Sequence, residues 1–140
     1  MIEQTMIDKL VARARTAGKR AYAPYSHYPV GAAVLAASGR IYSGGNVENA
    51  SYGLTVCAER VAVWTAASAG ERDIVAVAVS TPNGAAPCGA CRQVLAEFLP
   101  GQGERDILVI VDKGDSQSIL RLSELLPYAF LPRDLPKRLS

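Results

Sequence analysis

The segment Ile74-Val75-Ala76-Val77-Ala78-Val79-Ser80 decides the fold. Its unbroken run of isoleucine, valine and alanine is typical of a strand that is buried on both faces of a sheet. The segments 56–69 and 88–98, on either side of it, carry the composition and end signals of helices, and 107–111 predicts a second buried strand. Strands that alternate with helices in this way predict a three-layer α/β/α sandwich around a mixed sheet.

Further elements extend this core in both directions. Near the N-terminus, the spacing of apolar residues predicts a helix that Thr5 caps and that ends between Gly18 and Ala21. The chain then predicts a proline-containing loop at 23–29, a hairpin with strands at 30–37 and 40–43, and a polar loop at 44–55. Near the C-terminus it predicts a last strand at 118–122, a short helical turn at 123–127 and a proline-rich tail.

The composition fits one domain, which we expect to span residues 1–140. The net charge is only +2 and the basic residues are scattered, which argues against a nucleic-acid partner. No apolar run approaches the ~18 residues of a membrane span, and the N-terminus lacks the layout of a signal peptide. We therefore expect a cytoplasmic protein without a membrane partner, in which the three cysteines stay reduced.

The cysteines carry the strongest chemical signal. They stand in Thr55-Val56-Cys57-Ala58-Glu59-Arg60 and in Ala86-Pro87-Cys88-Gly89-Ala90-Cys91-Arg92-Gln93, each at the start of a predicted helix. Cys88 and Cys91 are three residues apart, so their sulfurs face the same way on a first helical turn, and Cys57 can supply a third sulfur. Three sulfurs leave one tetrahedral position of a Zn²⁺ ion open for water, as in catalytic zinc sites.

Glu59 follows the first cysteine by two residues, off the ligand direction but close to the metal. A carboxylate there suits a base that takes a proton from zinc-activated water and passes it to a substrate nitrogen. The pattern Cys57-x-Glu59…Pro87-Cys88-x-x-Cys91 matches the signature of zinc-dependent deaminases. It predicts one zinc ion per subunit and a hydrolytic deamination in which Glu59 shuttles the proton.

Three thiolates over-compensate the two charges of zinc, so a group that withdraws charge from the sulfurs is needed. Two helix N-termini aimed at the ligands would supply partial positive charge. Arg60 and Arg92, next to the ligand segments, would donate hydrogen bonds to the thiolates, unless they only solvate the surface.

Four segments resemble the small, homotetrameric branch of the cytidine deaminase family. They are Tyr25-Ser26-His27-Tyr28-Pro29-Val30-Gly31-Ala32-Ala33, Gly45-Asn46-Val47-Glu48-Asn49-Ala50-Ser51-Tyr52, Cys57-Ala58-Glu59-Arg60 and Pro87-Cys88-Gly89-Ala90-Cys91-Arg92-Gln93. The resemblance implies deamination of cytidine and deoxycytidine to uridine and deoxyuridine with release of ammonia, in pyrimidine salvage. It also implies a homotetramer whose active sites are completed across subunits.

The resemblance further implies which residues contact the nucleoside. Asn46 and Glu48 would hold the ribose hydroxyls, and an amide and a carboxylate two apart in an extended loop do point the same way. Ala58 would offer backbone groups to the cytosine ring. Ala50 and Tyr52 would lie near the sugar of a nucleoside bound to a neighbouring subunit.

Two aromatic residues are expected near the base. Tyr28 stands just before Pro29, where the family usually has phenylalanine. Its ring can pack on a pyrimidine, but its hydroxyl needs a partner if it is buried. Phe130 would reach into a neighbouring site and stack on the base, although from the sequence alone it could equally fill the core of its own subunit.

Other functions remain open at this point. A relative with the same zinc motif could deaminate another aminopyrimidine, such as blasticidin S. Deamination of a base in a polynucleotide would need added basic and aromatic surface. A non-catalytic, zinc-stabilised binding module would fit if His27, the one histidine, were a fourth ligand that closes the site.

Overall fold

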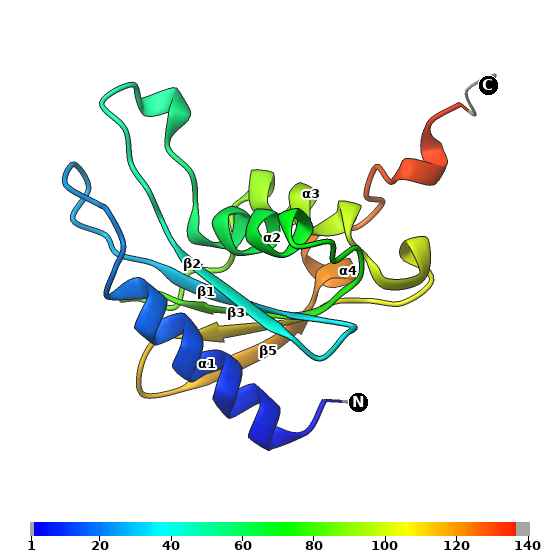
Figure 1. The fold of residues 1–140 in the computed structure, drawn as a ribbon, viewed down its shortest axis with the longest axis horizontal. Helices are drawn as coiled ribbons and strands as arrows, with labels where there is room; N and C mark the ends of the chain where they lie inside the picture. Colours follow the sequence, from blue (N-terminus) through cyan, green and yellow to red (C-terminus); the bar gives the residue numbers. More distant parts are fainter. Residues whose placement is uncertain (1, 137–140) are drawn as a thin grey trace.

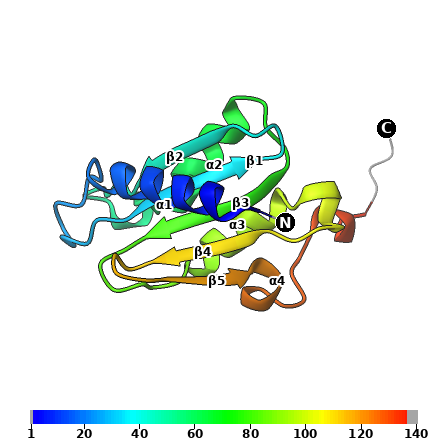
Figure 2. The ribbon, with the colours of Figure 1, turned by 90° about the horizontal axis from the view of Figure 1, so that it is seen from below.

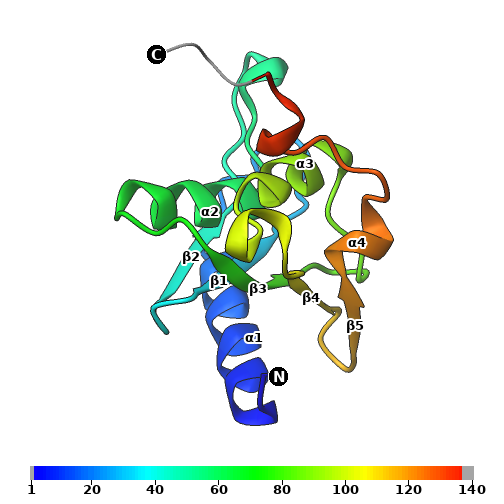
Figure 3. The ribbon, with the colours of Figure 1, turned by 90° about the vertical axis from the view of Figure 1, so that its right-hand side faces the viewer.

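In the computed structural model, which describes residues 2–136, a five-stranded sheet lies between helices on both of its faces (Figures 1 and 3). The elements in chain order are α1 (Gln4–Gly18), β1 (Gly31–Ala36), β2 (Ile41–Gly45), α2 (Ala58–Ser68), β3 (Ile74–Ser80), α3 (Gly89–Glu97), β4 (Leu108–Asp112), β5 (Gln117–Arg121) and α4 (Leu122–Leu125). Short 3-10 turns lie at Tyr52–Leu54, Pro100–Gly103 and Pro132–Asp134. The predicted three-layer α/β/α sandwich is confirmed.

The sheet has the strand order β2-β1-β3-β4-β5 and is mixed, as the sequence predicts. β3 pairs in parallel with β4, while β1 pairs antiparallel with both β2 and β3, and β5 antiparallel with β4. The parallel pair needs a crossover, and α3 provides it. β3 therefore lies at the centre of the sheet, which explains the apolar run that marks it in the sequence.

Each face of the sheet packs against its own helices through small residues. On the α1 face, Leu10 and Ala14 pack against Ala33, Ala76 and Ile110. Figure 2 shows α1 alone across this face. On the other face α2 and α3 cover the sheet, and their buried residues include Ala62, Val63 and Leu95. Alanine on both sides of these contacts lets helix and strand approach closely, which leaves little room for larger side chains.

Two glycines explain where the sequence prediction of β2 stops short. The prediction ends this strand at Ser43 and assigns 44–55 to a polar loop, yet β2 continues through Gly45. A Cβ atom at Gly44 would lie 2.5 Å from a side-chain carbon of Val61 in α2. A Cβ atom at Gly45 would lie 2.8 Å from the carbonyl oxygen of Ala17 in α1. Glycine therefore suits both strand positions, because α2 packs closely against Gly44 and α1 packs closely against Gly45.

The boundaries of two helices and two strands also differ from the prediction by a few residues. Glu3, and not Thr5, occupies the N-cap position of α1, and Thr5 lies inside the helix. α2 starts at Ala58 instead of residue 56, because the backbone of Val56 pairs with Val47 before the helix begins. Both β4 and β5 lie one residue away from their predicted bounds, at Leu108–Asp112 and Gln117–Arg121.

The loop between α1 and β1 and the loop between β2 and α2 project from the same end of the molecule (Figure 1). Backbone hydrogen bonds from Tyr22 to Asn46 and from Glu48 to Tyr22 join them at their base. These loops carry most of the residues that the sequence assigns to substrate binding. Among residues 2–136, no helix has the length and apolarity required to cross a membrane.

Candidate active site

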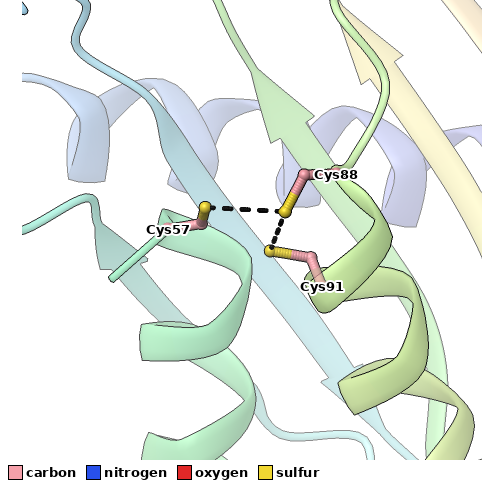
Figure 4. Close-up of side chains that lie close together, drawn as sticks. All are labelled: Cys57, Cys88 and Cys91. Atoms are coloured by element: carbon pink, nitrogen blue, oxygen red, sulfur yellow. Dashed lines mark hydrogen bonds between the residues drawn. The ribbon is translucent and has the colours of Figure 1, made fainter. Parts of the chain in front are cut away.

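The three cysteine sulfurs converge between the starts of α2 and α3 (Figure 4). Cys57 is the N-cap residue of α2 and Cys88 the N-cap residue of α3, while Cys91 lies buried in the first turn of α3. The Cys57 and Cys88 sulfurs are 3.8 Å apart, and those of Cys88 and Cys91 are 3.4 Å apart. The sequence prediction that these residues form one cluster is confirmed.

This arrangement fits a zinc ion. With Zn–S bonds of about 2.3 Å, two sulfurs at tetrahedral positions lie about 3.8 Å apart. The Cys57–Cys88 and Cys88–Cys91 sulfur separations agree with that value within a few tenths of an ångström. Among the described residues, no histidine or carboxylate joins the three cysteines in this cluster. His27 is exposed in the loop before β1, with a φ of 55°, so the structure gives no support to a closed site with His27 as fourth ligand.

Arg60 and the two helix starts place positive charge beside the sulfurs. The Arg60 Nη2 donates a hydrogen bond of 3.3 Å to the Cys57 sulfur. Its Nε is buried and has no hydrogen-bond partner among the described residues, and the Cys57 sulfur is the acceptor that the guanidinium does reach. Neither helix start has a side-chain cap, which leaves first-turn N–H groups free to face the sulfurs.

The thiols already differ in acidity without a metal. The pKa of Cys57 is lowered to about 5 by hydrogen bonding with Cys91, and then with Arg60, against the effect of burial. The pKa of Cys91 is raised by the same contact with Cys57 and by burial. The protein alone therefore favours a thiolate at Cys57, whereas Cys91 would lose its proton on binding a metal ion.

The side chain of Arg92 has other hydrogen-bond partners than the sequence suggests. It donates from Nε to the Pro87 carbonyl, at 2.7 Å, and from Nη1 to the Leu125 carbonyl, at 2.8 Å, instead of to a thiolate. The next residue, Gln93, donates to the Phe130 carbonyl, at 2.8 Å. The predicted contact of Arg92 with sulfur is thus corrected. Backbone carbonyls satisfy its guanidinium, and it holds the C-terminal segment against α3.

A cavity of about 390 Å³ opens beside the cysteines and has the size of a small-molecule site. Its lining includes Cys57, Cys88, Glu59, Ala58, Asn46, Glu48 and Tyr28. Glu59 is 4% exposed, and burial raises its pKa, an effect that the charge of Cys57 reinforces. The structure therefore brings an unusually basic carboxylate to the metal cluster, which is the property a proton carrier needs.

Asn46 and Glu48 line the same cavity and hold the loop before β1. The Asn46 side chain accepts from the Val30 amide, at 2.8 Å, and donates to the Tyr28 carbonyl, at 3.1 Å. Glu48 accepts from the Tyr25 and Ser26 amides and from the Ser26 hydroxyl, and the hydroxyl bond is the main reason that its pKa is lowered. Each side chain keeps hydrogen-bonding capacity for a ligand, because an amide and a carboxylate offer more sites than these partners occupy.

Some predicted residues lie outside this cavity. Ala50 and Tyr52 are exposed on the projecting loop between β2 and α2, where the Tyr52 ring meets that of Tyr25 edge to face, with centroids 5.8 Å apart. Phe130 is 57% exposed, which excludes the alternative that it fills the core of its own subunit. None of the three lines the cavity of its own chain.

Sequence reasoning missed three polar residues around the cavity. Ser26 is hydrogen bonded to Glu48, Thr81 lines the cavity at the end of β3, and Asn83 accepts the hydroxyl hydrogen of Tyr28. Ser26 stands in the quoted segment 25–33 and a polar residue between two tyrosines could have drawn attention. Asn83 carries no local signal, because its partner is 55 residues away.

Comparisons with known proteins agree with this geometry. The chain is 46% identical over 131 residues to the cytidine deaminase of Sporosarcina psychrophila, covering 92% of this chain and 94% of that protein. It is 48% identical over 128 residues to the cytidine deaminase of Halalkalibacterium halodurans, covering 90% and 95%. The crystal structure of cytidine deaminase from Burkholderia pseudomallei superposes with a TM-score of 0.80 at 41% identity, covering 88% of this chain and 98% of that one.

The family described as the cytidine and deoxycytidylate deaminase zinc-binding region matches residues 4–102, which include all three cysteines, Glu59, Asn46 and Glu48. This match covers well over half of the chain and contains the three cysteines that converge in space. The chain therefore belongs to the zinc-dependent cytidine and deoxycytidylate deaminase family.

Proposed function

We propose that the chain is a single nucleoside deaminase domain that hydrolyses cytidine and deoxycytidine to uridine and deoxyuridine, with release of ammonia. One observation carries this proposal: a buried carboxylate, Glu59, lines the same cavity as Cys57 and Cys88, whose sulfurs converge with that of Cys91. The relatives that are 46% and 48% identical over 131 and 128 aligned residues are cytidine deaminases, which supports cytidine as the substrate. The role of this reaction in the cell would be pyrimidine salvage.

Cys57, Cys88 and Cys91 would hold the zinc ion. When bound, zinc supplies the Lewis acidity that lets a water molecule lose a proton near neutral pH. Glu59 takes this proton and delivers it to N3 of the cytosine as C4 is attacked. Glu59 then carries the second proton of the water to the departing amine, so that cytidine and water become uridine and ammonia. A single carboxylate can act twice because burial raises its pKa toward the working pH.

The two carboxylates of the cavity have opposite environments, which separates their roles. Glu48 accepts three hydrogen bonds that lower its pKa, so it stays ionised and suits a fixed acceptor for sugar hydroxyls. Glu59 is buried with a raised pKa and suits proton transfer. Groups whose environments push their pKa values apart in this way commonly divide binding from acid–base work. Asn46, beside Glu48, would complete the ribose contacts, and Ala58 would present its backbone to the base.

We further propose a homotetramer in which neighbouring subunits complete each cavity. Ala50, Tyr52 and Phe130 are exposed and lie outside the cavity of their own chain, so they would act on a neighbour's nucleoside. A groove lined by Val47, Val56, Val61 and Trp64 exposes further apolar surface on α2, as a subunit interface would. Three free thiols favour a reducing compartment, the cytoplasm.

The test is a direct assay of zinc-loaded protein with cytidine, deoxycytidine and blasticidin S as separate substrates. Substrate loss is measured by ultraviolet absorbance, and the ammonia released is quantified in parallel. We expect both nucleosides to be consumed with one ammonia per molecule, and blasticidin S to stay unchanged. If only blasticidin S reacts, the substrate half of the proposal is wrong. If zinc is bound and none of the three reacts, the protein is a binding module and the proposed activity fails.

A further inference from the structure

A hydrogen bond joins two loops that both contribute to the cavity lining. The Tyr28 hydroxyl, in the loop before β1, donates to Oδ1 of Asn83, in the loop between β3 and α3. Both loops contribute to the cavity lining, the first through Ser26 and Tyr28, and the second through Thr81, Ala85 and Ala86. The second loop leads directly into Cys88. The bond therefore links the sugar side of the cavity to its metal side.

Both partners of this bond are held in place by other contacts. The Tyr28 amide donates to the Ser26 hydroxyl oxygen, at 3.1 Å, and the Tyr28 carbonyl accepts from the Asn46 side chain, at 3.1 Å. With its backbone fixed at both ends, the ring direction depends on the side-chain torsions, which the hydroxyl contact restricts. A phenylalanine at this position would pack similarly but could not make the contact.

The loop on the Asn83 side is a compact turn with its own hydrogen bonds. The Thr81 hydroxyl oxygen accepts from the amides of Gly84, at 2.7 Å, and Ala85, at 3.1 Å. The Ala85 amide lies 3.3 Å from Oδ1 of Asn83, which orients the Asn83 side chain so that its oxygen faces Tyr28. Because these hydrogen bonds connect Asn83 to the rest of the turn, a displacement of Asn83 would also displace the cavity wall that precedes Cys88.

We propose that the Tyr28–Asn83 hydrogen bond is a positioning contact that holds the Tyr28 ring and the 81–87 loop at the separation a bound pyrimidine requires. The inference rests on the proposed function for the identity of the ligand, and it adds Asn83 as a residue that sets substrate affinity. Tyr28 and Asn83 act by arranging the cavity before the substrate arrives. Their loss therefore weakens the binding of substrate and transition state alike, which raises KM and leaves kcat nearly unchanged.

The experiment is a double-mutant cycle with Tyr28→Phe, Asn83→Ala and the double variant, all measured with zinc-loaded protein and cytidine. Asn83 is exposed and water competes for its amide, so we expect the Tyr28→Phe substitution to raise KM about 2- to 5-fold, the lower part of the range for one neutral hydrogen bond. The same substitution in the Asn83→Ala background should change KM no further, because the bond is already lost.

Tyr42→Phe is the matched control, because it removes a 2.9 Å hydrogen bond from a tyrosine hydroxyl to Glu71. Neither Tyr42 nor Glu71 lines the cavity. This variant should keep the KM of the unmodified protein. A second readout needs no substrate: amide hydrogen exchange of residues 81–88 should be faster in Tyr28→Phe and unchanged in Tyr42→Phe.

The outcomes separate the two proposals. Additive effects of the two substitutions on KM, or an unchanged exchange rate of residues 81–88 in Tyr28→Phe, would overturn the positioning contact. A fall in kcat at constant KM would overturn it as well, because the contact would then act on the chemical step. If the unmodified protein leaves cytidine unchanged, the proposed function fails and with it the identity of the ligand, while the exchange rates still decide whether the bond ties the two loops.

Discussion

The replacement of Glu59 by glutamine is the sharpest test of how the cavity works. Glutamine keeps the shape and most of the burial of the side chain, which is 4% exposed, but it carries no exchangeable acid proton. Removal of one general acid–base group slows a reaction about 10²- to 10⁴-fold, which is about 2.7 to 5.4 kcal/mol in the activation barrier. Because Glu59 would transfer protons both to N3 and to the amine, we expect kcat to fall by the upper part of this range.

The assay is turnover of cytidine by absorbance, with zinc content and melting temperature measured on the same preparation. Zinc content should not change, because Glu59 lies outside the cysteine cluster. Glu48→Gln is the comparison, since this carboxylate lies in the same cavity but holds a loop and the proposed sugar site. It should raise KM far more than it lowers kcat. A zinc-loaded, folded Glu59→Gln protein with kcat within tenfold of the original would refute the proton-shuttle role.

Three further predictions concern charge and metal. Arg60→Gln should retain the fold but lower kcat about 10-fold or more, because the Cys57 thiolate loses its 3.3 Å hydrogen bond and the zinc becomes a weaker Lewis acid; unchanged turnover at full zinc content would contradict this. Removal of zinc by a chelator should abolish turnover and lower the melting temperature. Titration with zinc should restore turnover and raise the melting temperature as the zinc concentration increases. A melting temperature that does not depend on the zinc concentration would count against the site. Arg15 donates two hydrogen bonds to the buried Asp112 and holds the pKa of this carboxyl well below its usual range. The ionised carboxylate therefore stabilises the folded state fully above about pH 4, the pKa of an aspartate in the unfolded chain. This contribution is lost as the pH falls toward the lower pKa of the folded state. In metal-free protein, thermal melts between pH 5 and pH 2 should therefore fall less steeply for Asp112→Asn than for the original chain, and parallel curves would show that the pair contributes nothing.

The parts of the fold that local patterns determine could be predicted from the sequence. The sequence predicts both bounds of the central strand Ile74–Ser80, because a strand buried on both faces leaves an unbroken apolar run. The cysteine spacing likewise predicted a cluster, since a helical first turn brings residues three apart to one side. In both cases the physical cause lies within a few residues of the pattern.

Features that depend on distant contacts could not be predicted in this way. Gly44 and Gly45 look like a loop, and only the approach of α1 and α2 explains why they continue a strand. Asp112 accepts two hydrogen bonds from Arg15, 97 residues away, and further ones from Ser80 and Gln117. Arg92 sits beside a ligand in sequence, yet its partners are backbone carbonyls set by the path of the C-terminal segment. Sequence neighbours predict such contacts poorly, because tertiary packing chooses among several available partners.

The position of the cysteines at two helix starts makes the metal a cross-link of the chain. Cys57 precedes α2 and Cys88 precedes α3, so an ion that binds both closes a ring that contains α2 and the central strand β3. Because the unfolded chain holds no preformed site, the free energy of metal binding adds to that of folding. A cell that runs short of zinc would therefore hold less folded protein, and not merely an intact protein that waits for its metal.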